Sequence, residues 1–217
     1  MRHLILTPDR NTPPDNDFTG AFDPEAIRYR RHYEAAGDEV LRRNIDVGVG
    51  NAARRAQTLR YIADAAPFDR IAAFCHGWVD GIQFGFSRGR TLEALATALV
   101  ASSTDALKVA LYACSTAKSD GPPGDSGEGG FADSLRDLLA AKGRPDVTVF
   151  GHTSAGHTTH NPQCRMFLRG CELGGVRLAE TGSPAYQKLQ KRLQAASDPL
   201  RWTMPYMTLD EIRAAIG

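Results

Sequence analysis

Short apolar runs alternate along the chain with stretches in which apolar residues recur every three or four positions. The apolar runs have the length of strands and lie at His3 to Leu6, Arg70 to Cys75, Leu107 to Ala113 and Val147 to Phe150. The stretches with helical period lie at residues 24–36, 51–66, 91–102 and 130–142. This alternation predicts an α/β fold, a three-layer sandwich in which helices flank both faces of a mostly parallel sheet.

The pattern weakens after Pro162. It still indicates a strand at Arg165 to Leu168, a helix around Ala185 to Ala196 and a last helix from about Leu209. A chain of 217 residues suits one α/β domain or slightly more. We therefore predict an α/β domain over residues 1–170 and a helical extension over residues 171–217, packed on the same domain.

The charges nearly cancel, with 26 Lys and Arg against 25 Asp and Glu. No long-range field favours polyanions or acidic membranes, so we expect neither nucleic acid nor a membrane as partner. No apolar run approaches the roughly 18 residues of a membrane-spanning helix. The four cysteines form no C-x-x-C pair, which fits the reducing cytoplasm.

Basic residues gather in the N-terminal quarter of the chain. They are Arg28, Arg30, Arg31 and His32, followed by Arg42, Arg43, Arg54 and Arg55. The default interpretation is a solvated surface, and the Arg-rich N-terminal helices are also a candidate docking face for an acidic partner.

A histidine and a cysteine each follow a predicted strand. His76 and Gly77 come after one strand, and Cys114 and Ser115 come after another, at the edge of a parallel sheet where ligands gather. A cysteine nucleophile needs an imidazole within reach, and the amides of Gly77 and Cys114 suit an oxyanion hole. The sequence thus predicts a His76–Cys114 dyad that needs no metal or organic cofactor.

Four motifs in order carry a family resemblance over Ile71 to His160: "IAAFCHGW", "VALYACSTA", "GGFADSLRDLL" and "VTVFGH". The segment resembles the caspase-like fold of caspases, gingipains, clostripain, legumain and separase, and is most similar to bacterial caspase-like domains. The resemblance implies a cysteine endopeptidase that acts on protein or peptide substrates. In it, Cys114 is the nucleophile, His76 the general acid and base, and Gly77 an oxyanion donor.

The resemblance also implies a substrate-binding cleft. Relatives carry a polar or acidic residue two positions before the nucleophile, whereas this chain has Tyr112, so the usual preference for a charged substrate residue is in doubt. Ser115, His152 and Trp78 are the other predicted substrate-binding residues, with Trp78 either walling the cleft or packing. Self-cleavage within the loop over residues 119–129 stays open.

Three alternatives remain. Gly85 to Gly89 reads G-x-S-x-G, the nucleophile elbow of serine α/β-hydrolases, although a β-hairpin or rim turn at Gly81 to Arg90 is the preferred interpretation of Ser87. His152, His157, His160 and Cys164 are four potential metal ligands, but their spacing is not a standard zinc pattern, and we predict no metal there. The third alternative is a caspase-like binding module with an inactive site.

Overall fold

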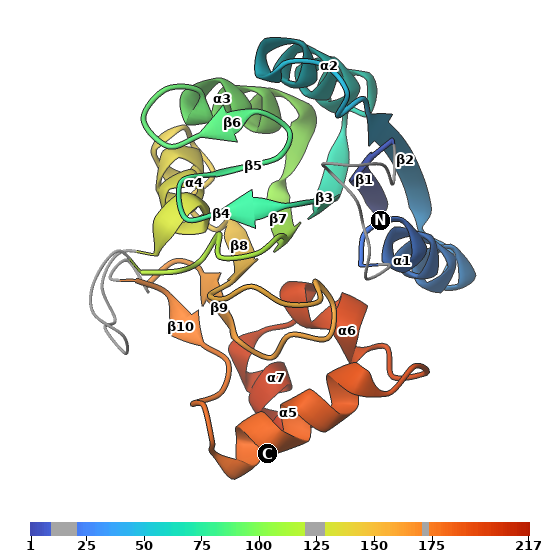
Figure 1. Ribbon diagram of the computed structural model, residues 1–217, viewed down its shortest axis with the longest axis vertical. Coiled ribbons are helices and arrows are strands. Elements are labelled where there is room, and N and C mark those ends of the chain that lie inside the picture. Colours follow the sequence, from blue (N-terminus) through green and yellow to red (C-terminus); the bar gives the residue numbers. More distant parts are fainter. Residues whose placement is uncertain (10–20, 120–128, 171–173) are drawn as a thin grey trace.

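The computed structural model describes residues 1–9, 21–119, 129–170 and 174–217 (Figure 1). The main sheet of this described part has seven strands in the order β10-β9-β8-β7-β3-β1-β2. Their bounds are β1 Arg2–Pro8, β2 Glu39–Ile45, β3 Phe68–Phe74, β7 Ser103–Tyr112, β8 Thr148–His152, β9 Cys164–Phe167 and β10 Val176–Arg177. The five strands from β2 to β8 pair in parallel, and β9 and β10 are antiparallel. The predicted mostly parallel sheet is confirmed.

Helices cover both faces of this sheet. One face carries α2 (Asn51–Asp64), α3 (Leu92–Ser102) and α4 (Gly130–Ala141). The other carries α1 (Asp23–Ala35), α5 (Pro184–Gln194), α6 (Leu200–Thr203), the 3-10 turn η1 (Met204–Tyr206) and α7 (Leu209–Ile216). The chain is therefore a three-layer α/β sandwich, as its hydrophobic pattern predicted. The predicted division at residue 170 stays a prediction.

The strands build two cores because successive side chains point to opposite faces of a sheet. In β3, Ile71 and Ala73 join the core under α2, α3 and α4. Their neighbours Ala72 and Phe74 join the core under α1 and the C-terminal helices. A strand that is buried on both faces shows a continuous apolar run, which is why β3 was recognisable in the sequence.

Four elements of the structure were not predicted from the sequence: β2, β10, α6 and η1. In β2 only Val40 and Ile45 are buried, and the polar residues Arg42, Arg43 and Asn44 lie between them. This strand forms the edge of the sheet, so it has no apolar run to reveal it. The other three elements are only two to four residues long.

A second, small sheet lies beyond the end of β3. It consists of β4 (Gly77–Trp78), β5 (Gly81–Ile82) and β6 (Phe86–Ser87), paired antiparallel. The predicted hairpin at Gly81 to Arg90 is confirmed. No helix in the described part of the chain is long and apolar enough to cross a membrane.

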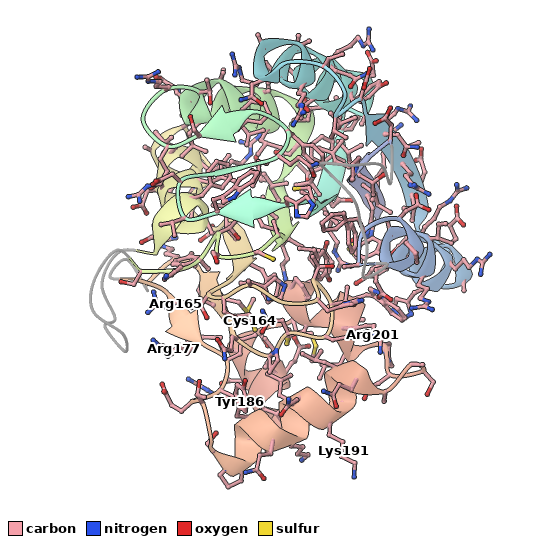
Figure 2. All side chains as sticks on the ribbon, viewed as in Figure 1. Cys164, Arg165, Arg177, Tyr186, Lys191 and Arg201 are labelled. Atoms are coloured by element: carbon pink, nitrogen blue, oxygen red, sulfur yellow. The ribbon has the colours of Figure 1, made fainter. Side chains whose placement is uncertain are left out.

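The C-terminal helices are anchored to the sheet by apolar burial. Leu189 of α5 is fully buried, whereas Lys191 on the same helix is exposed and directed away from the molecule (Figure 2). We expect Leu189→Ala to lower the free energy of unfolding by about 2–5 kcal/mol, because it leaves a cavity in the core. Urea denaturation measures this change, and Lys191→Ala is the matched control, with a change within about 0.5 kcal/mol. Equal effects of the two substitutions would contradict the packing of α5.

Candidate active site at the carboxyl edge of the sheet

The carboxyl ends of β3 and β7 lie side by side. The two strands pair in parallel with Phe74 opposite Tyr112, and the amide of Cys75 donates to the Tyr112 carbonyl at 3.3 Å. Continuing this register by two residues sets His76 beside Cys114. The structure therefore brings the two predicted dyad residues to one edge of the sheet.

Both residues follow the face of the sheet that α1 covers. The rings of Phe74 and Tyr112 stack on this face at 4.5 Å with an interplanar angle of 10°. Side chains alternate along a strand, so the next side chains on that face are those of His76 and Cys114. The His76 ring meets Phe22 edge to face at 4.8 Å, and Phe22 belongs to the same core.

Cys114 differs from the other described cysteines in its exposure. Its side chain is partly exposed, and its Sγ lies 3.5 Å from the carbonyl oxygen of Gly156, to which the thiol donates. Cys75 and Cys164 are buried, and burial raises the pKa of both thiols well above the usual value. Cys171 lies outside the described residues. Among the described thiols, Cys114 is thus the one that solvent reaches.

The chain turns sharply after Cys114. Ser115 has a φ of 58°, the one positive value among the described residues other than glycine. Its amide donates to the carbonyl of Ser154 at 3.3 Å, which fixes the turn. The amide of Cys114 has no hydrogen-bond partner among the described residues, so it is available to an incoming acceptor. Strained backbone of this kind is concentrated at functional sites.

Gly77 packs directly against this turn. A Cβ built on Gly77 would lie 2.7 Å from the Cys114 carbonyl oxygen, 2.8 Å from the Ala113 Cβ and 2.9 Å from the Thr116 Cγ2. A side chain at this position would force the two strand ends apart. The next residue, Trp78, is 56% exposed, so it stands over the surface and does not pack in the core.

The His76 imidazole and the Cys114 thiol are not hydrogen-bonded to each other in the part of the chain that the structure describes. The His76 backbone is held instead, since its amide donates to Gln83 Oε1 at 3.2 Å and its carbonyl accepts from the Gln83 amide at 2.9 Å. Hydrogen bonds between catalytic groups are often long or unformed before substrate binds. The strand ends set the two groups near each other without locking their side chains.

Two predicted substrate-binding residues are corrected by their burial. Tyr112 is 1% exposed, and its hydroxyl donates to the Arg201 carbonyl at 3.0 Å, so it lines no pocket. His152 is 2% exposed, and its Nε2 donates to the Thr158 carbonyl at 2.6 Å. Both point into the core because β7 and β8 are covered on this face by the C-terminal helices. Asp120, Asp125 and Glu128, the acidic residues of the predicted loop over residues 119–129, lie outside the described residues.

A cavity of about 550 Å³ opens between the small sheet and the start of α2. Its wall includes Trp78, Ser87, Arg55 and Arg90. Ser87 sits within a two-residue antiparallel strand, and its amide donates to Thr91 Oγ1 at 2.8 Å. A nucleophile elbow instead needs a sharp turn directly between a strand and a helix, so the serine-hydrolase alternative is wrong.

The N-terminal arginines are largely engaged within the chain. Arg28 pairs with Glu25, Arg42 with Asp23, and Arg30 Nε with Glu34 at 2.7 Å. Arg54 donates to three backbone carbonyls, those of Val47, Val49 and Gln83. The predicted docking face for an acidic partner stays a prediction.

The four potential metal ligands noted in the sequence do not converge. His152 is buried and bonded to Thr158, and Cys164 Sγ donates to the Pro162 carbonyl at 3.4 Å. His157 and His160 instead meet Glu25 of α1, with one ligand atom of each residue within 4.8 Å of the others. Sequence reasoning missed Glu25, because more than 130 residues separate it from the histidines and no local spacing links them.

Comparison with known proteins yields no family model that matches the chain and no match among curated proteins. Among solved structures, an aromatic-amino-acid aminotransferase from Burkholderia pseudomallei, covalently bound to pyridoxal phosphate, matches with a TM-score of 0.41 and 13% identity. The match covers 99% of this chain, which spans 47% of the aminotransferase chain. Likeness at this level carries neither the activity nor the cofactor of that enzyme to this chain.

The family prediction is corrected by these comparisons. No family model and no curated protein supports membership of the caspase-like peptidases, and a solved structure that matches weakly is an aminotransferase. The predicted cysteine endopeptidase, its hydrolase and thiol-protease description and the inactive caspase-like module are therefore not supported. The burial of Tyr112 adds a physical reason, since the specificity pocket that the resemblance implied does not form around it.

The close packing at Gly77 predicts the effect of a methyl group there. We expect Gly77→Ala to lower the free energy of unfolding by about 1–3 kcal/mol, because the new Cβ overlaps the backbone of the Cys114 turn. Chemical denaturation measures this loss. Gly50→Ala serves as control, since a Cβ at Gly50 meets no atom within 4 Å and the loss there stays below about 1 kcal/mol. Unchanged stability of Gly77→Ala would refute the contact.

The buried His152 predicts a dependence of stability on pH. Burial lowers its pKa from 6.5 to about 4, although its bonds to backbone carbonyls oppose the shift. The unfolded chain therefore binds more protons between these values, and the free energy of unfolding falls as the pH drops from about 6.5 toward 4. We expect wild type to lose about 2 kcal/mol more than His152→Asn between pH 7.5 and pH 5, measured by urea denaturation. Equal losses would show that His152 does not titrate on unfolding.

Proposed function

We propose that Cys114 and His76 form a thiol-based acyl-transfer site. The observation that carries this proposal is the pairing of β3 with β7, which supports a partly exposed thiol and an imidazole at adjacent strand ends on one face. The unpartnered Cys114 amide next to the thiol adds a donor for a developing oxyanion. Cys75 and Cys164 are buried and so lack the exposure of Cys114.

The reaction has two steps, acylation of Cys114 and transfer of the acyl group to an acceptor. His76 takes the proton of the Cys114 thiol, and the thiolate attacks the carbonyl carbon of an activated acyl donor such as a thioester. The new carbon–sulfur bond forms as the bond to the leaving thiol breaks, and His76 returns the proton to that thiol. An amine or thiol acceptor then attacks the carbonyl carbon of the S-acyl enzyme and gives its proton to His76. The bond between this carbon and the Cys114 sulfur breaks, and His76 returns the proton to the Cys114 thiolate, so no oxidant or reductant is needed.

We propose that the protein acts in the cytoplasm. The three described cysteines are all free, and a free nucleophilic thiol persists in a reducing compartment. The acyl donor and acceptor are small molecules or chains that reach the open edge of the sheet.

Acylation by a thioester tests the proposal. We expect the acetyl thioester of N-acetylcysteamine to add one acetyl group to Cys114, detected by intact-mass and peptide mass spectrometry. His76→Ala is expected to slow this acylation by about 100-fold or more, since it removes the group that accepts the thiol proton.

The control is Cys164→Ala, which removes a buried thiol and leaves the acylation rate unchanged. Circular dichroism verifies that each variant is folded. Acylation that persists in Cys114→Ser, or a His76→Ala variant as fast as wild type, would disprove the proposal.

A further inference from the structure

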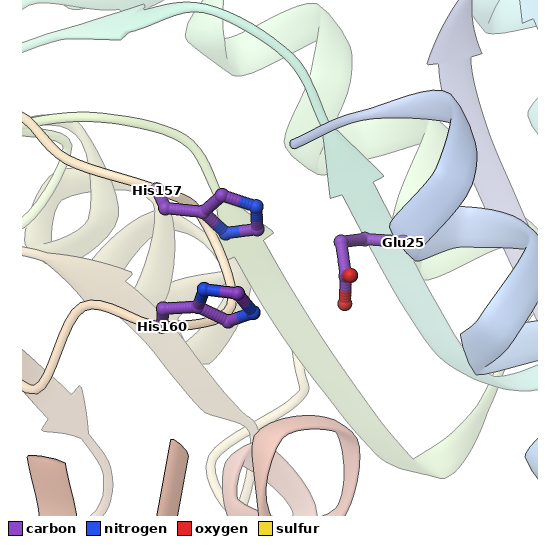
Figure 3. A group of neighbouring side chains, drawn as sticks. All are labelled: Glu25, His157 and His160. Atoms are coloured by element: carbon purple, nitrogen blue, oxygen red, sulfur yellow. The ribbon is translucent and has the colours of Figure 1, made fainter. Parts of the chain in front are cut away.

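Two imidazoles and a carboxylate meet between α1 and the loop over residues 153–163. The rings of His157 and His160 stack with centroids 3.8 Å apart and an interplanar angle of 9°. Figure 3 shows both rings facing the Glu25 carboxylate, and the ligand atoms of the three residues lie within 4.8 Å of one another. The residues come from opposite ends of the fold, so only the folded chain assembles them.

A tight turn sets the two histidines on one side of the loop. The amides of His160 and Asn161 both donate to the His157 carbonyl, at 3.2 and 3.1 Å. A turn of this length places side chains three residues apart above one another. The stacking is therefore a consequence of the backbone and persists without a ligand.

The Nε2 of His160 is buried and has no hydrogen-bond partner. A buried polar atom without a partner is costly, and a metal ion is one way to satisfy it.

We propose that Glu25, His157 and His160 form a binding site for Zn²⁺. Two imidazoles and one carboxylate are a donor set that zinc uses, with a fourth position left to water, whereas Mg²⁺ and Ca²⁺ prefer oxygen ligands. Zinc bonds of about 2.0–2.2 Å put tetrahedral ligand atoms about 3.3–3.6 Å apart. The observed separations of up to 4.8 Å must therefore shorten by about 1 Å, and the two stacked rings must tilt apart, because zinc lies in the plane of each imidazole that binds it.

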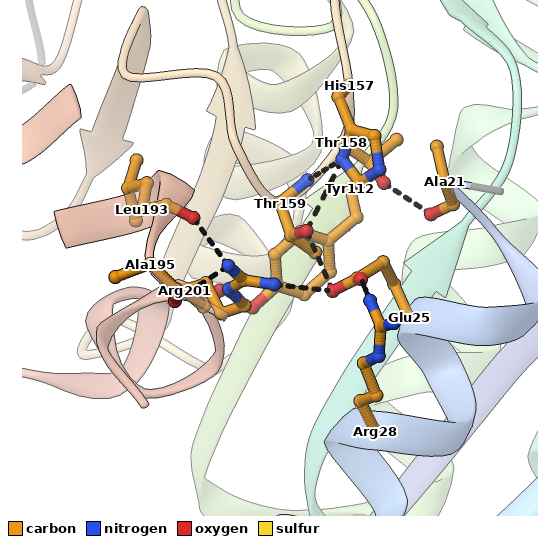
Figure 4. Close-up of polar contacts among 10 residues, drawn as sticks. All are labelled: Ala21, Glu25, Arg28, Tyr112, His157, Thr158, Thr159, Leu193, Ala195 and Arg201. Carbon is orange, nitrogen blue, oxygen red and sulfur yellow. Dashed lines mark hydrogen bonds and ion pairs between the residues drawn. The ribbon is translucent and has the colours of Figure 1, made fainter. Parts of the chain in front are cut away.

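The surroundings of Glu25 both support and oppose the ion. Thr159 Oγ1 donates to Glu25 Oε2 at 2.8 Å and lies 3.4 Å from His157 Nδ1, so this hydroxyl orients two of the three ligands (Figure 4). Such outer partners are usual around zinc ligands. Arg28 also donates to Glu25, and the buried Arg201 lies 3.7 Å from the same carboxylate, so two positive charges compete with a cation. The Arg28 side chain is 52% exposed, so it can move into solvent as zinc binds.

Calorimetric titration with Zn²⁺ and absorption spectroscopy with Co²⁺ test the site. Both use the full chain in a Cys114→Ser, Cys171→Ser background, which leaves only the two buried thiols Cys75 and Cys164, so that the acyl-transfer proposal is not involved. We expect one Zn²⁺ per chain and the visible d–d bands of Co²⁺ in a low-coordinate nitrogen and oxygen site. His157→Ala and His160→Ala should each weaken binding at least about tenfold.

Arg28→Gln distinguishes binding at this site from adventitious binding, which would not respond to the loss of a charge beside Glu25. Removing this exposed competing charge should strengthen zinc binding about two- to fivefold. His32→Ala is the matched control, since His32 lies on α1 outside the three-residue group, and it should leave the affinity unchanged. Absence of saturable binding, or affinity unchanged in both histidine variants, overturns the proposal.

Discussion

A buried ion pair joins the two ends of the chain. Glu25 of α1 is 0% exposed and Arg201 of α6 is 1% exposed, and their charged atoms lie 3.7 Å apart. Removing one partner of such a pair costs on the order of 3–5 kcal/mol in proteins generally, since the other charge is left buried. Figure 4 shows the other hydrogen bonds of the pair. Arg201 also donates to the carbonyls of Leu193 and Ala195.

The layer of C-terminal helices is positioned by this pair and by the aromatic side chains around it. The Tyr112 hydroxyl donates to the Arg201 carbonyl, and the Tyr33 hydroxyl donates to the Trp202 carbonyl at 3.1 Å. These bonds tie α6 to β7 and to α1, and so close the sheet face that ends at Cys114. The position of Cys114 at the edge of the sheet therefore depends on the contacts of α6 with β7 and α1.

Much of the fold could be predicted from the sequence, because its central strands are buried on both faces and its helices show a regular apolar period. The edge strand β2 could not, since only Val40 and Ile45 of its seven residues are buried. Tyr112 and His152 show why site residues are harder to predict. The family resemblance implied a substrate-binding cleft at both residues, but the side to which each residue points depends on the sheet register and on helices far along the chain.

The resemblance to a peptidase family arose from short motifs that strand ends of many parallel sheets share. Small residues are needed beside such strand ends simply because the backbones pack closely there. Gly77 is an example, since a Cβ would overlap the Cys114 carbonyl oxygen. Glu25 illustrates the opposite case. It carries no local signal at all, and its position beside two histidines follows only from the tertiary structure.

The loop over residues 153–163 contacts both groups described at this edge. Gly156 accepts from Cys114, and the next residue is His157, which stacks on His160. Thr158 in the same loop donates to the Ala21 carbonyl at 2.6 Å. A single inserted or deleted residue here would shift every one of these contacts at once. Over evolutionary time this loop should therefore keep its length, unlike most surface loops.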